Sequence, residues 1–484
     1  MKALYFLLIM MAFMIHTYGQ RNQNVILNIV SFPEEKVYNF NLVSKLVTDS
    51  CVTIDLHPRY SNVSSIGGVL KLFSDGNRVF NASCQVMLNG DTLSNKFIYD
   101  SIPFYIPIMG DPPIIFSFDD SLYYIVSTSG TYPWALRDSV FYSIVDITAD
   151  SGRGAVVSKR NLLMTGEFMS GLKCTKHANG RDWWVVGHSY LADTFITTLF
   201  TPEGPLAPLK QRIGLFEDCI NNCGALDFKS VFSKSGDKFV QLSSADSNRV
   251  GLLEFDRCTG LFYNYDSVYL ANLLPMPEIN FRPLISPDGS QVYIMKASGL
   301  FQLDFNTHQV HTVSLIDTAI YGPTAYYFTS MFPTPDDKIL IGIAGLPYFS
   351  CINLPNQHGA SLDYTVNTYP IPAPLQTTIA VFINHELGAV EGSVCDSLIG
   401  INDLGGKALA LSLYPNPASD VINLVLNSSI SKEVWVSLIN ATGQLVNRQR
   451  VLFQNGHARL SIKDLSPGLY LIQVGQKSQR VMVE

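Results

Sequence analysis

The sequence predicts an all-β protein, a β-propeller of about seven blades followed by a small Ig-like β-sandwich. The first observation is a strand-and-turn phrase that recurs between residues 25 and 395, and the second is a set of short alternating segments after residue 411. The third is composition, because 47% of the 484 residues are hydrophobic and only 15% are charged. Unfolded chains are poor in apolar residues and rich in charge, so disorder is excluded for most of the protein.

The recurring phrase is an apolar residue, a polar turn with Gly or Asp, and a β-branched or aromatic segment. Asn-Gly and Asp-Gly supply the positive φ angles of tight hairpins, so each copy predicts two strands joined by a turn. Copies lie at 176–184, 232–240, 285–293 and 332–340, and further hairpins are expected at 72–80 and 118–124. The turns at Gly180, Gly236, Gly289 and Asp337 are 56, 53 and 48 residues apart.

A second phrase, an apolar segment running into Asp-x-x-Thr, lies between the copies at 251–260 and 299–308. Two hairpins in a unit of about 50 residues give four strands, which is the size of a propeller blade. The blade phrase resembles that of WD40-like propellers, in which Ser-Pro-Asp-Gly precedes a strand, with a full match at 286–289. Together with 73–92 and 255–260, it resembles secreted propellers of Bacteroidota.

The first 19 residues are predicted to be a secretory signal peptide. Lys2 precedes the apolar run 4–15, and Gly19 offers a small residue at the expected cleavage site. The run is too short to span a membrane, and no later apolar stretch reaches that length, so no transmembrane helix is expected after signal removal. The expected domains are 1–19, the propeller at 20–396, a linker at 397–410, and the C-terminal module at 411–484.

The C-terminal module shows short alternating segments about ten residues apart, with a turn in each gap, which predicts a β-sandwich. The expected strands are 421–426, 433–439, 444–451, 458–462, 469–474 and 479–483. Its motifs are Tyr414-Pro415-Asn416-Pro417 at the start, a turn ending at Gly443, and Pro467-Gly468 followed by Tyr470.

These three motifs closely resemble the type A sorting domain of the type IX secretion system. The resemblance implies that the type IX secretion machinery is a partner and that the protein is secreted or displayed on the cell surface. It also implies removal of the module and attachment to lipopolysaccharide, although Lys477, Arg480 and Glu484 replace the usual closing lysines. The alternatives are an Ig-like spacer or a carbohydrate-binding sandwich.

Eight cysteines in an exported chain are an even number, which favours disulfides or buried thiols over a metal site. The candidate disulfide cysteines are Cys219, Cys223 and Cys258, with Cys51 and Cys84 as a second group. A zinc site would need a second close Cys or His pair, and none follows.

No catalytic, metal or cofactor motif emerges, so no cofactor is expected. His177, Asp182 and His188 flank Trp183-Trp184 as a candidate acid–base group, but packing of the two tryptophans between blades is favoured. His308 and His311 are candidate metal ligands, with exposed loop residues as the favoured interpretation. Asp119-Asp120 and Asp336-Asp337 are candidate carboxylate pairs for glycoside hydrolysis, with solvated turns favoured. His385-Glu386 lacks the second histidine of a zinc protease.

A balance of 33 basic and 40 acidic residues gives no footprint for a phosphate backbone, so nucleic acid is not expected as a partner. The sequence favours an exported protein that binds a glycan or a protein through a rigid scaffold rich in aromatic residues. A secreted hydrolase or lyase with its site in the propeller channel is the alternative, and a structural surface-layer component is another.

Overall fold

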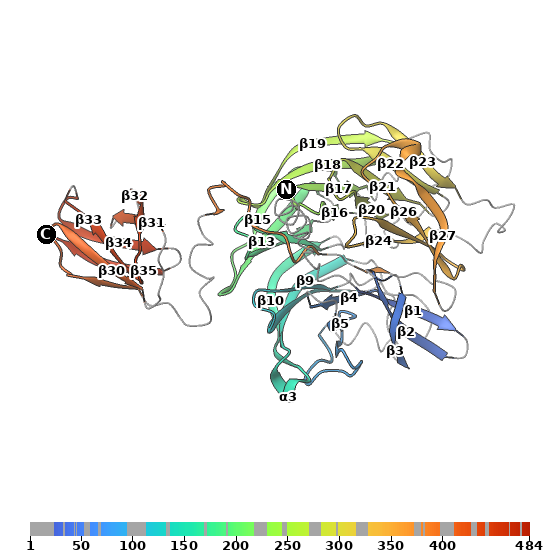
Figure 1. Cartoon of the computed structure of the whole chain (residues 1–484), viewed down its shortest axis with the longest axis horizontal. Coiled ribbons are helices and arrows are strands. Elements are labelled where there is room, and N and C mark those ends of the chain that lie inside the picture. The colour runs from blue at the N-terminus through green and yellow to red at the C-terminus, as the bar shows by residue number, and fades with distance from the viewer. Residues whose placement is uncertain are drawn as a thin grey trace, which may run out of the picture. The chain divides into compact units, whose positions relative to one another are not determined.

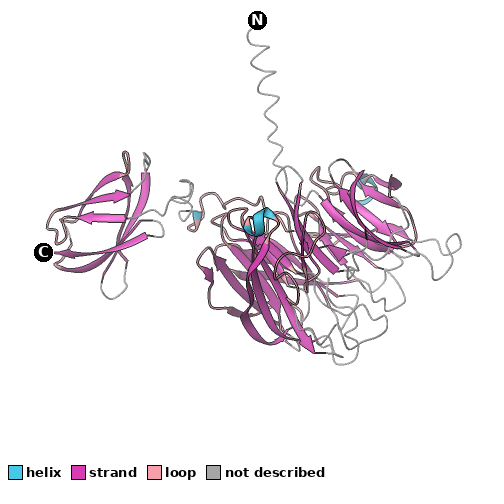
Figure 2. Cartoon of the chain, turned by 90° about the horizontal axis from the view of Figure 1, so that it is seen from below, coloured by secondary structure: helices cyan, strands magenta, loops and turns pink. Residues whose placement is uncertain are grey.

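The computed structural model describes residues 24–31, 34–42, 44, 46–52, 59–65, 69–93, 113–131, 136–168, 172–189, 192–216, 230–243, 249–270, 282–296, 299–315, 328–371, 379–380, 383–396, 411–426, 433–440, 445–463, 465–474 and 477–484. The predicted signal peptide and linker lie outside them. The chain divides into two units, one of Met1–His177 with Asp182–Leu387 and the other of Ala178–Arg181 with Gly388–Glu484. Among the described residues, regular secondary structure is almost entirely strand, as Figure 2 shows.

The described residues of the first unit form seven sheets. In chain order their strands are β1 (Asn24–Ser31), β2 (Glu34–Asn41), β3 (Leu46–Val52); β4 (Arg59–Ser64), β5 (Leu70–Ser74), β6 (Val79–Asn81) with β28 (Ile379–Ala380); β7 (Ile114–Ser117), β8 (Leu122–Thr131), β9 (Leu136–Asp146), β10 (Ala155–Phe168); β11 (Lys173–Lys176), β12 (Trp183–His188), β13 (Thr194–Thr201), β14 (Gly204–Pro205), β15 (Leu209–Arg212); β16 (Ser230–Phe232), β17 (Lys238–Leu242), β18 (Arg249–Asp256), β19 (Leu261–Tyr269); β20 (Arg282–Ile285), β21 (Gln291–Met295), β22 (Gly299–Asp304), β23 (Val310–Leu315); β24 (Phe328–Pro333), β25 (Ile339–Ile343), β26 (Tyr348–Ile352), β27 (Tyr364–Pro370). Two short helices, α3 (Ala149–Gly152) and η1 (Gly359–Leu362), lie in connections.

These sheets are the blades of a propeller (Figure 1). In most of them the strands pair antiparallel in sequence order, as in β16-β17-β18-β19 and β20-β21-β22-β23. Several successive sheets meet through their first strands, with β11 against β16, β16 against β20, and β20 against β24. The all-β fold class and the expected number of about seven blades are therefore confirmed. The sheet of β4, β5 and β6 also receives β28 from the far end of the unit, paired parallel to β4.

The turn residues Ser233, Ser286 and Thr334 explain the recurring phrase. Each follows the first strand of its blade, and its backbone N–H donates to a carbonyl across the turn at 2.8–2.9 Å. Its side-chain hydroxyl accepts a hydrogen bond, at 2.9–3.0 Å, from the backbone N–H of the residue that supplies this carbonyl. A short hydroxyl side chain thus doubles the backbone pairing that closes each hairpin, which is why Ser or Thr belongs in the phrase.

Trp183 and Trp184 fill two different blade interfaces. Successive residues of a strand point to opposite faces, so neighbours on β12 enter neighbouring cores. Trp183 is fully buried with Phe116 at a ring-centre distance of 5.3 Å, between the sheets of β7 and β11. Trp184 is buried in the next core, edge-on to Phe255. The predicted packing of both tryptophans between blades is confirmed.

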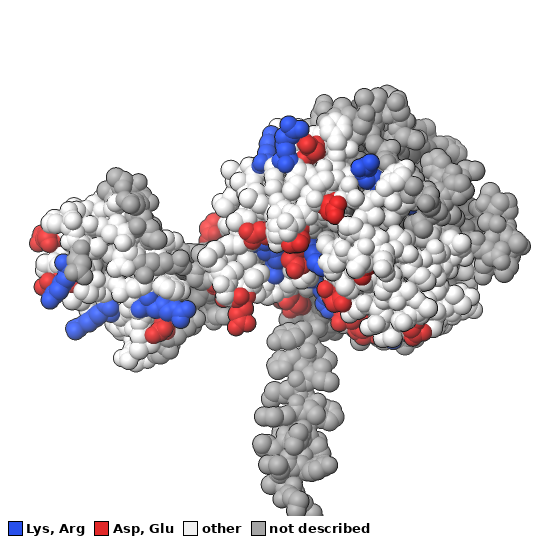
Figure 3. All heavy atoms as spheres, turned by 90° about the horizontal axis from the view of Figure 1, so that it is seen from above, with Lys and Arg blue, Asp and Glu red and all other residues white. Residues whose placement is uncertain are grey.

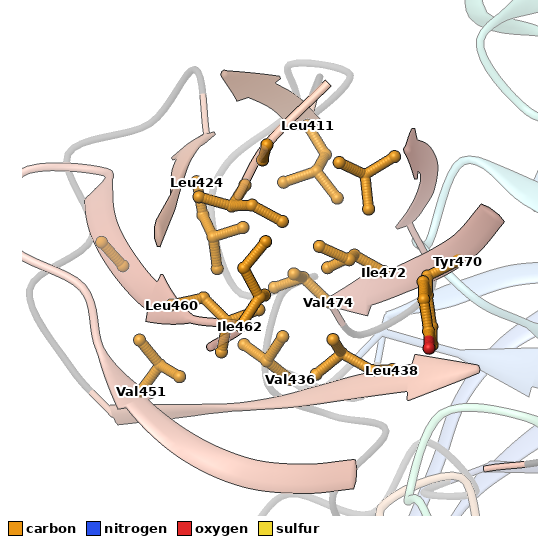
Figure 4. Packing of buried hydrophobic residues seen from close by; sticks show 14 of the residues in the cluster. Leu411, Leu424, Val436, Leu438, Val451, Leu460, Ile462, Tyr470, Ile472 and Val474 are labelled. Carbon is orange, nitrogen blue, oxygen red and sulfur yellow. The ribbon is translucent and has the colours of Figure 1, made fainter. Parts of the chain in front are cut away.

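The C-terminal module is a sandwich of two sheets with its own core. One sheet has the order β29-β30-β33 and the other the order β32-β31-β34-β35. The strands are β29 (Leu411–Tyr414), β30 (Val421–Leu426), β31 (Glu433–Asn440), β32 (Leu445–Leu452), β33 (His457–Ser461), β34 (Gly468–Val474) and β35 (Lys477–Val483). Alternate residues such as Leu424, Val436 and Ile472 point into the core between the sheets (Figure 4). Six of these strands match the predicted ones closely, and β29 is additional.

No described helix is long and apolar enough to cross a membrane. On the face in Figure 3, most of the described surface is uncharged, and basic side chains are interspersed with acidic ones. That face shows no extended basic surface of the kind that tracks a phosphate backbone.

Candidate functional site

A pocket opens beside the first strands of four successive blades. It encloses about 800 Å³, including its open mouth. Its wall comes from the β11, β16, β20 and β24 regions and from the segment that follows residue 382. The lining residues are Cys174, Thr175, Val231, Phe232, Ser233, Lys234, Leu284, Ile285, Pro287, Pro333, Thr334, Asp337, Ile339, Ile383 and Asn384. Nine of the fifteen are apolar or thiol side chains, so the pocket has an apolar wall with a few polar groups, as ligand sites usually have.

One ion pair lies at this pocket. Lys234 Nζ donates to Asp337 Oδ1 at 2.5 Å. Lys234 is in the β16–β17 turn and Asp337 in the β24–β25 turn, so the pair reaches across the intervening blade of β20–β23. The side chains are 38% and 54% exposed, and such a pair contributes at most about 1 kcal/mol to stability. Both groups are therefore accessible to a ligand at little cost to the fold.

The backbone holds this pair in place. Asn384 Nδ2 donates to the carbonyl of Lys234 at 2.7 Å, which fixes the turn that carries the lysine. Asp337 has a φ of 59°, in the left-handed region that Asp tolerates better than most residues. The hydroxyls of Ser233 and Thr334 are engaged in their own turns, so Lys234 and Asp337 are the polar groups best placed to meet a ligand.

Cys174 forms part of the apolar wall and has no nucleophilic character. It is a free, buried cysteine on β11, and burial raises the pKa of its thiol well above the ordinary value. The nucleophilic form of cysteine is the thiolate, which this environment suppresses.

The candidate acid–base group His177, Asp182 and His188 is not assembled. His177 and Asp182 are joined by a backbone hydrogen bond, and the His177 ring contacts the carbonyl of Cys258 at 3.0 Å. His188 lies at the opposite end of β12, against the ring of Phe195. The three residues hold the structure rather than face a common space.

The carboxylate pairs Asp119-Asp120 and Asp336-Asp337 both lie in hairpin turns, which is the interpretation that the sequence favoured. Asp119 Oδ1 accepts the backbone N–H groups of Ser121 and Leu122, each at 3.0 Å. Asp337, however, also lines the pocket, a role that the turn pattern did not reveal.

His385, from the sequence motif that lacks the second histidine of a zinc protease, is buried against the ring of Trp183. Among the described residues, no group of three or more His, Cys, Asp or Glu is arranged to hold a metal ion.

The described cysteines differ in whether they form a disulfide. Cys84, Cys258 and Cys395 are disulfide-bonded, and Cys174 and Cys351 are buried and outside any disulfide. Cys219, Cys223 and the side chain of Cys51 lie outside the described residues. Pairing among the predicted cysteines stays a prediction.

The motif residues of the C-terminal module converge on its last strand. Asn416 Nδ2 donates to the carbonyl of Arg480 at 3.0 Å, and Asn416 Oδ1 accepts the N–H of Met482 at 2.9 Å. Tyr414-Pro415 and Asn416-Pro417 are both cis peptides. Tyr470 is buried, and its hydroxyl donates to the carbonyl of Ser466, in the turn that contains Pro467 and Gly468. Gly443 lies outside the described residues.

Residues 412–484 match the family described as the secretion system C-terminal sorting domain. The C-terminal module is a sorting domain. It marks the protein as cargo of the type IX secretion system, which is secreted or displayed on the cell surface, and it implies an interaction with the secretion machinery. The predicted resemblance and localisation are confirmed, and the disulfides fit an extracellular location. The sorting domain carries seven basic and four acidic residues, whereas the remaining 410 residues carry 26 and 36.

Several solved structures resemble the propeller in outline. A putative 6-phosphogluconolactonase from Bacteroides uniformis covers 73% of this chain and 98% of its own, at 10% identity and a TM-score of 0.44. The periplasmic gluconolactonase of Pseudomonas aeruginosa covers 73% and 99%, at 13% identity and a TM-score of 0.39. A quinoprotein alcohol dehydrogenase-like protein from Bacteroides thetaiotaomicron covers 74% and 78%, at 10% identity and a TM-score of 0.34. A comparison with curated proteins finds no match.

Proposed function

We propose that this chain is an exported binding protein whose propeller holds a short, uncharged glycan in the pocket beside Lys234 and Asp337. The observation that carries the proposal is an accessible ion pair at an apolar-walled pocket of about 800 Å³. Apolar walls with a few polar groups are typical of sites that bind small molecules.

The chemistry of the lining supports this class of ligand. Phe232, Pro287 and Pro333 present flat or angular apolar surfaces, against which the C–H face of a sugar ring can pack. Lys234 offers a donor and Asp337 an acceptor, which together match neighbouring hydroxyl groups.

The charge balance favours an uncharged ligand. Lys234 and Asp337 neutralise each other, so a charged ligand would separate them and leave one charge without its partner. A polyhydroxy ligand can bond to both groups while the pair stays together.

The experiment is a glycan-array screen of the purified protein that scores retention and cleavage together. Lys234→Met and Asp337→Asn are compared with Lys159→Met, which removes a different ion pair, to Asp91. Each pocket substitution is expected to weaken retention about 10- to 100-fold, since a hydrogen bond to a charged group contributes about 1.5–3 kcal/mol. Lys159→Met is expected to bind as the parent does.

Other outcomes separate the alternatives. Equal retention by all three variants would move the binding site away from the pocket. Cleaved glycans would show that the protein is a hydrolase or lyase. If the screen shows no retention and no cleavage, glycan binding is overturned, and a protein partner or a surface-layer role takes its place.

A further inference from the structure

Two histidines from different blades lie close together away from the pocket. His311 is on β23, the last strand of its blade, where it is paired in register with Gln302. His358 comes from the connection between β26 and β27 of the following blade. The two ring centres are 6.3 Å apart, with the ring planes at 60°. Both residues are partly exposed.

The connection that carries His358 is tied to the neighbouring blade on both sides of the histidine. Gln302 is completely buried, and its Nε2 donates to the carbonyl of Gln357 at 2.6 Å. Its Oε1 accepts the N–H of Gly359 at 2.9 Å. Because the residues on either side of His358 bond to one buried side chain, the backbone presents His358 to His311 in a fixed position.

A chain of hydrogen bonds also assigns the tautomer of the neutral His358 ring. Gln291 Nε2 donates to Asp304 Oδ2 at 2.8 Å, which assigns the other end of the amide as oxygen. That oxygen lies 2.9 Å from His358 Nδ1. An amide oxygen only accepts, so Nδ1 carries the hydrogen and Nε2 keeps its lone pair. Metal-binding histidines are typically oriented in this way, through a hydrogen bond from the ring nitrogen that does not bind the metal.

We propose that His311 and His358 together bind a divalent transition-metal ion, with water completing the coordination. A ligating imidazole nitrogen lies about 2.0–2.1 Å from the metal, which puts each ring centre about 3.2 Å away. Two rings on one ion can therefore have centres up to about 6.4 Å apart, and the observed 6.3 Å falls within that reach. A small rotation of the partly exposed His311 side chain brings the rings to the closer spacing of an angular site.

The donor set points to Cu²⁺, Ni²⁺ or Zn²⁺, the ions that imidazole suits, and away from Ca²⁺ or Mg²⁺, which prefer oxygen. Cu²⁺ is the strongest binder of this series, so it is the most sensitive probe. The Cys174 and Cys351 side chains are buried, so neither is an exposed competing ligand for Cu²⁺.

The test is titration of the full chain, purified without a polyhistidine tag, with CuCl₂, followed by calorimetry and electron paramagnetic resonance. One equivalent is expected to bind, with superhyperfine splitting from two nitrogens. His311→Ala and His358→Ala should each lower the affinity at least about tenfold and remove one nitrogen from the spectrum. His308→Ala is the matched control, because His308 lies in the nearby β22–β23 turn beside Asp266 and should leave the site intact.

The orienting role of Gln291 has its own variant. Gln291→Met should lower Cu²⁺ affinity by about 10- to 100-fold and keep both nitrogens in the spectrum, since it removes the hydrogen bonds to His358 Nδ1 and to Asp304 and leaves both histidines in place. Thermal unfolding checks that each variant is folded. Absence of a stoichiometric Cu²⁺ site in the parent protein, or an unchanged site in both histidine variants, would overturn the proposal.

Discussion

Asn416 bonds to the last strand of the sorting domain as if it were a neighbouring strand residue. Its side-chain amide accepts the N–H of Met482 and donates to the carbonyl of Arg480. Two residues later, the N–H of Ala418 donates to the carbonyl of Met482, and the carbonyl of Ala418 accepts the N–H of Glu484 at the end of the chain. The Tyr-Pro-Asn-Pro motif and the end of the chain, far apart in the module's sequence, are thus one structural element.

The first prediction concerns this element. Asn416→Ala leaves two exposed backbone groups of β35 to bond with water, so the sorting domain should lose about 0.5–1.5 kcal/mol of stability for each hydrogen bond. Fractionation of cells should show less protein at the surface and more in the periplasm. Asn447→Ala, at an exposed position of β32, is the control and should be exported as the parent is. Normal surface delivery of Asn416→Ala would show that the tie does not matter for sorting.

The second prediction concerns Gly260, which lies against Trp184. A Cβ at this glycine would be 2.5 Å from the indole ring, and the residue has a φ of +75°. Gly260→Ala should therefore lower the unfolding free energy of the propeller by about 2–4 kcal/mol in total, which is more than the left-handed backbone alone would cost. Gly152→Ala is a matched control, because its φ is +82° and a Cβ there meets nothing within 4 Å. Urea unfolding curves measure both, and equal losses would contradict the packing argument.

The third prediction is a pH dependence of stability caused by His188. Both ring nitrogens are buried without a hydrogen-bond partner, and burial lowers the pKa of the imidazole to about 4 from its ordinary 6.5. Between those values the unfolded chain binds a proton that the folded one does not, so stability falls as pH falls from 6.5 towards 4. The loss over that window is about 3 kcal/mol. His188→Phe should remove it, as measured by unfolding free energy at pH 7.5 and 4.5.

The comparison needs a control for the other acid-sensitive groups. His457→Phe, at an exposed position of the sorting domain, should keep the parent's pH dependence in the propeller transition. An identical slope in His188→Phe and the parent would show that the histidine is not held neutral.

The fourth prediction concerns Arg257, which joins two blades from a buried position. Its guanidinium donates to the carbonyls of Lys176, His177 and Ser235 at 2.8–3.3 Å. Burial lowers its pKa to about 10, so it remains charged at neutral pH. Arg257→Leu leaves these carbonyls without their donor and should cost about 3–5 kcal/mol, measured by thermal and urea unfolding. Arg212→Leu, which removes an exposed pair with Asp193, should cost about 1 kcal/mol or less.

The sequence predicted the features that depend on neighbours in the chain. The turn at Asn455 and Gly456 has positive φ at both residues, as its Asn-Gly pair requires, and β33 after it alternates exposed and buried residues. Such signals are local, so the sandwich and the repeated hairpins could be predicted from them.

The candidate sites depend instead on residues far apart in sequence. Lys234 and Asp337 are separated by 103 positions and meet because their turns belong to alternate blades. His311, expected in an exposed loop, lies on β23, and it faces a histidine from the next blade. These groups come together only when the blades pack against one another, and no local sequence pattern predicts those contacts.

The parallel pairing of β28 with β4 has a consequence for how the protein matures. Ile379 pairs with Arg59, so one joint of the circle connects segments about 320 residues apart. That joint cannot form until nearly the whole propeller has been synthesised. The edge of β4 that receives β28 therefore lacks its partner strand until that point, and an unpaired strand edge can pair with another chain. The sorting domain follows β28 in sequence, so its synthesis ends only after the strand that makes this joint is present.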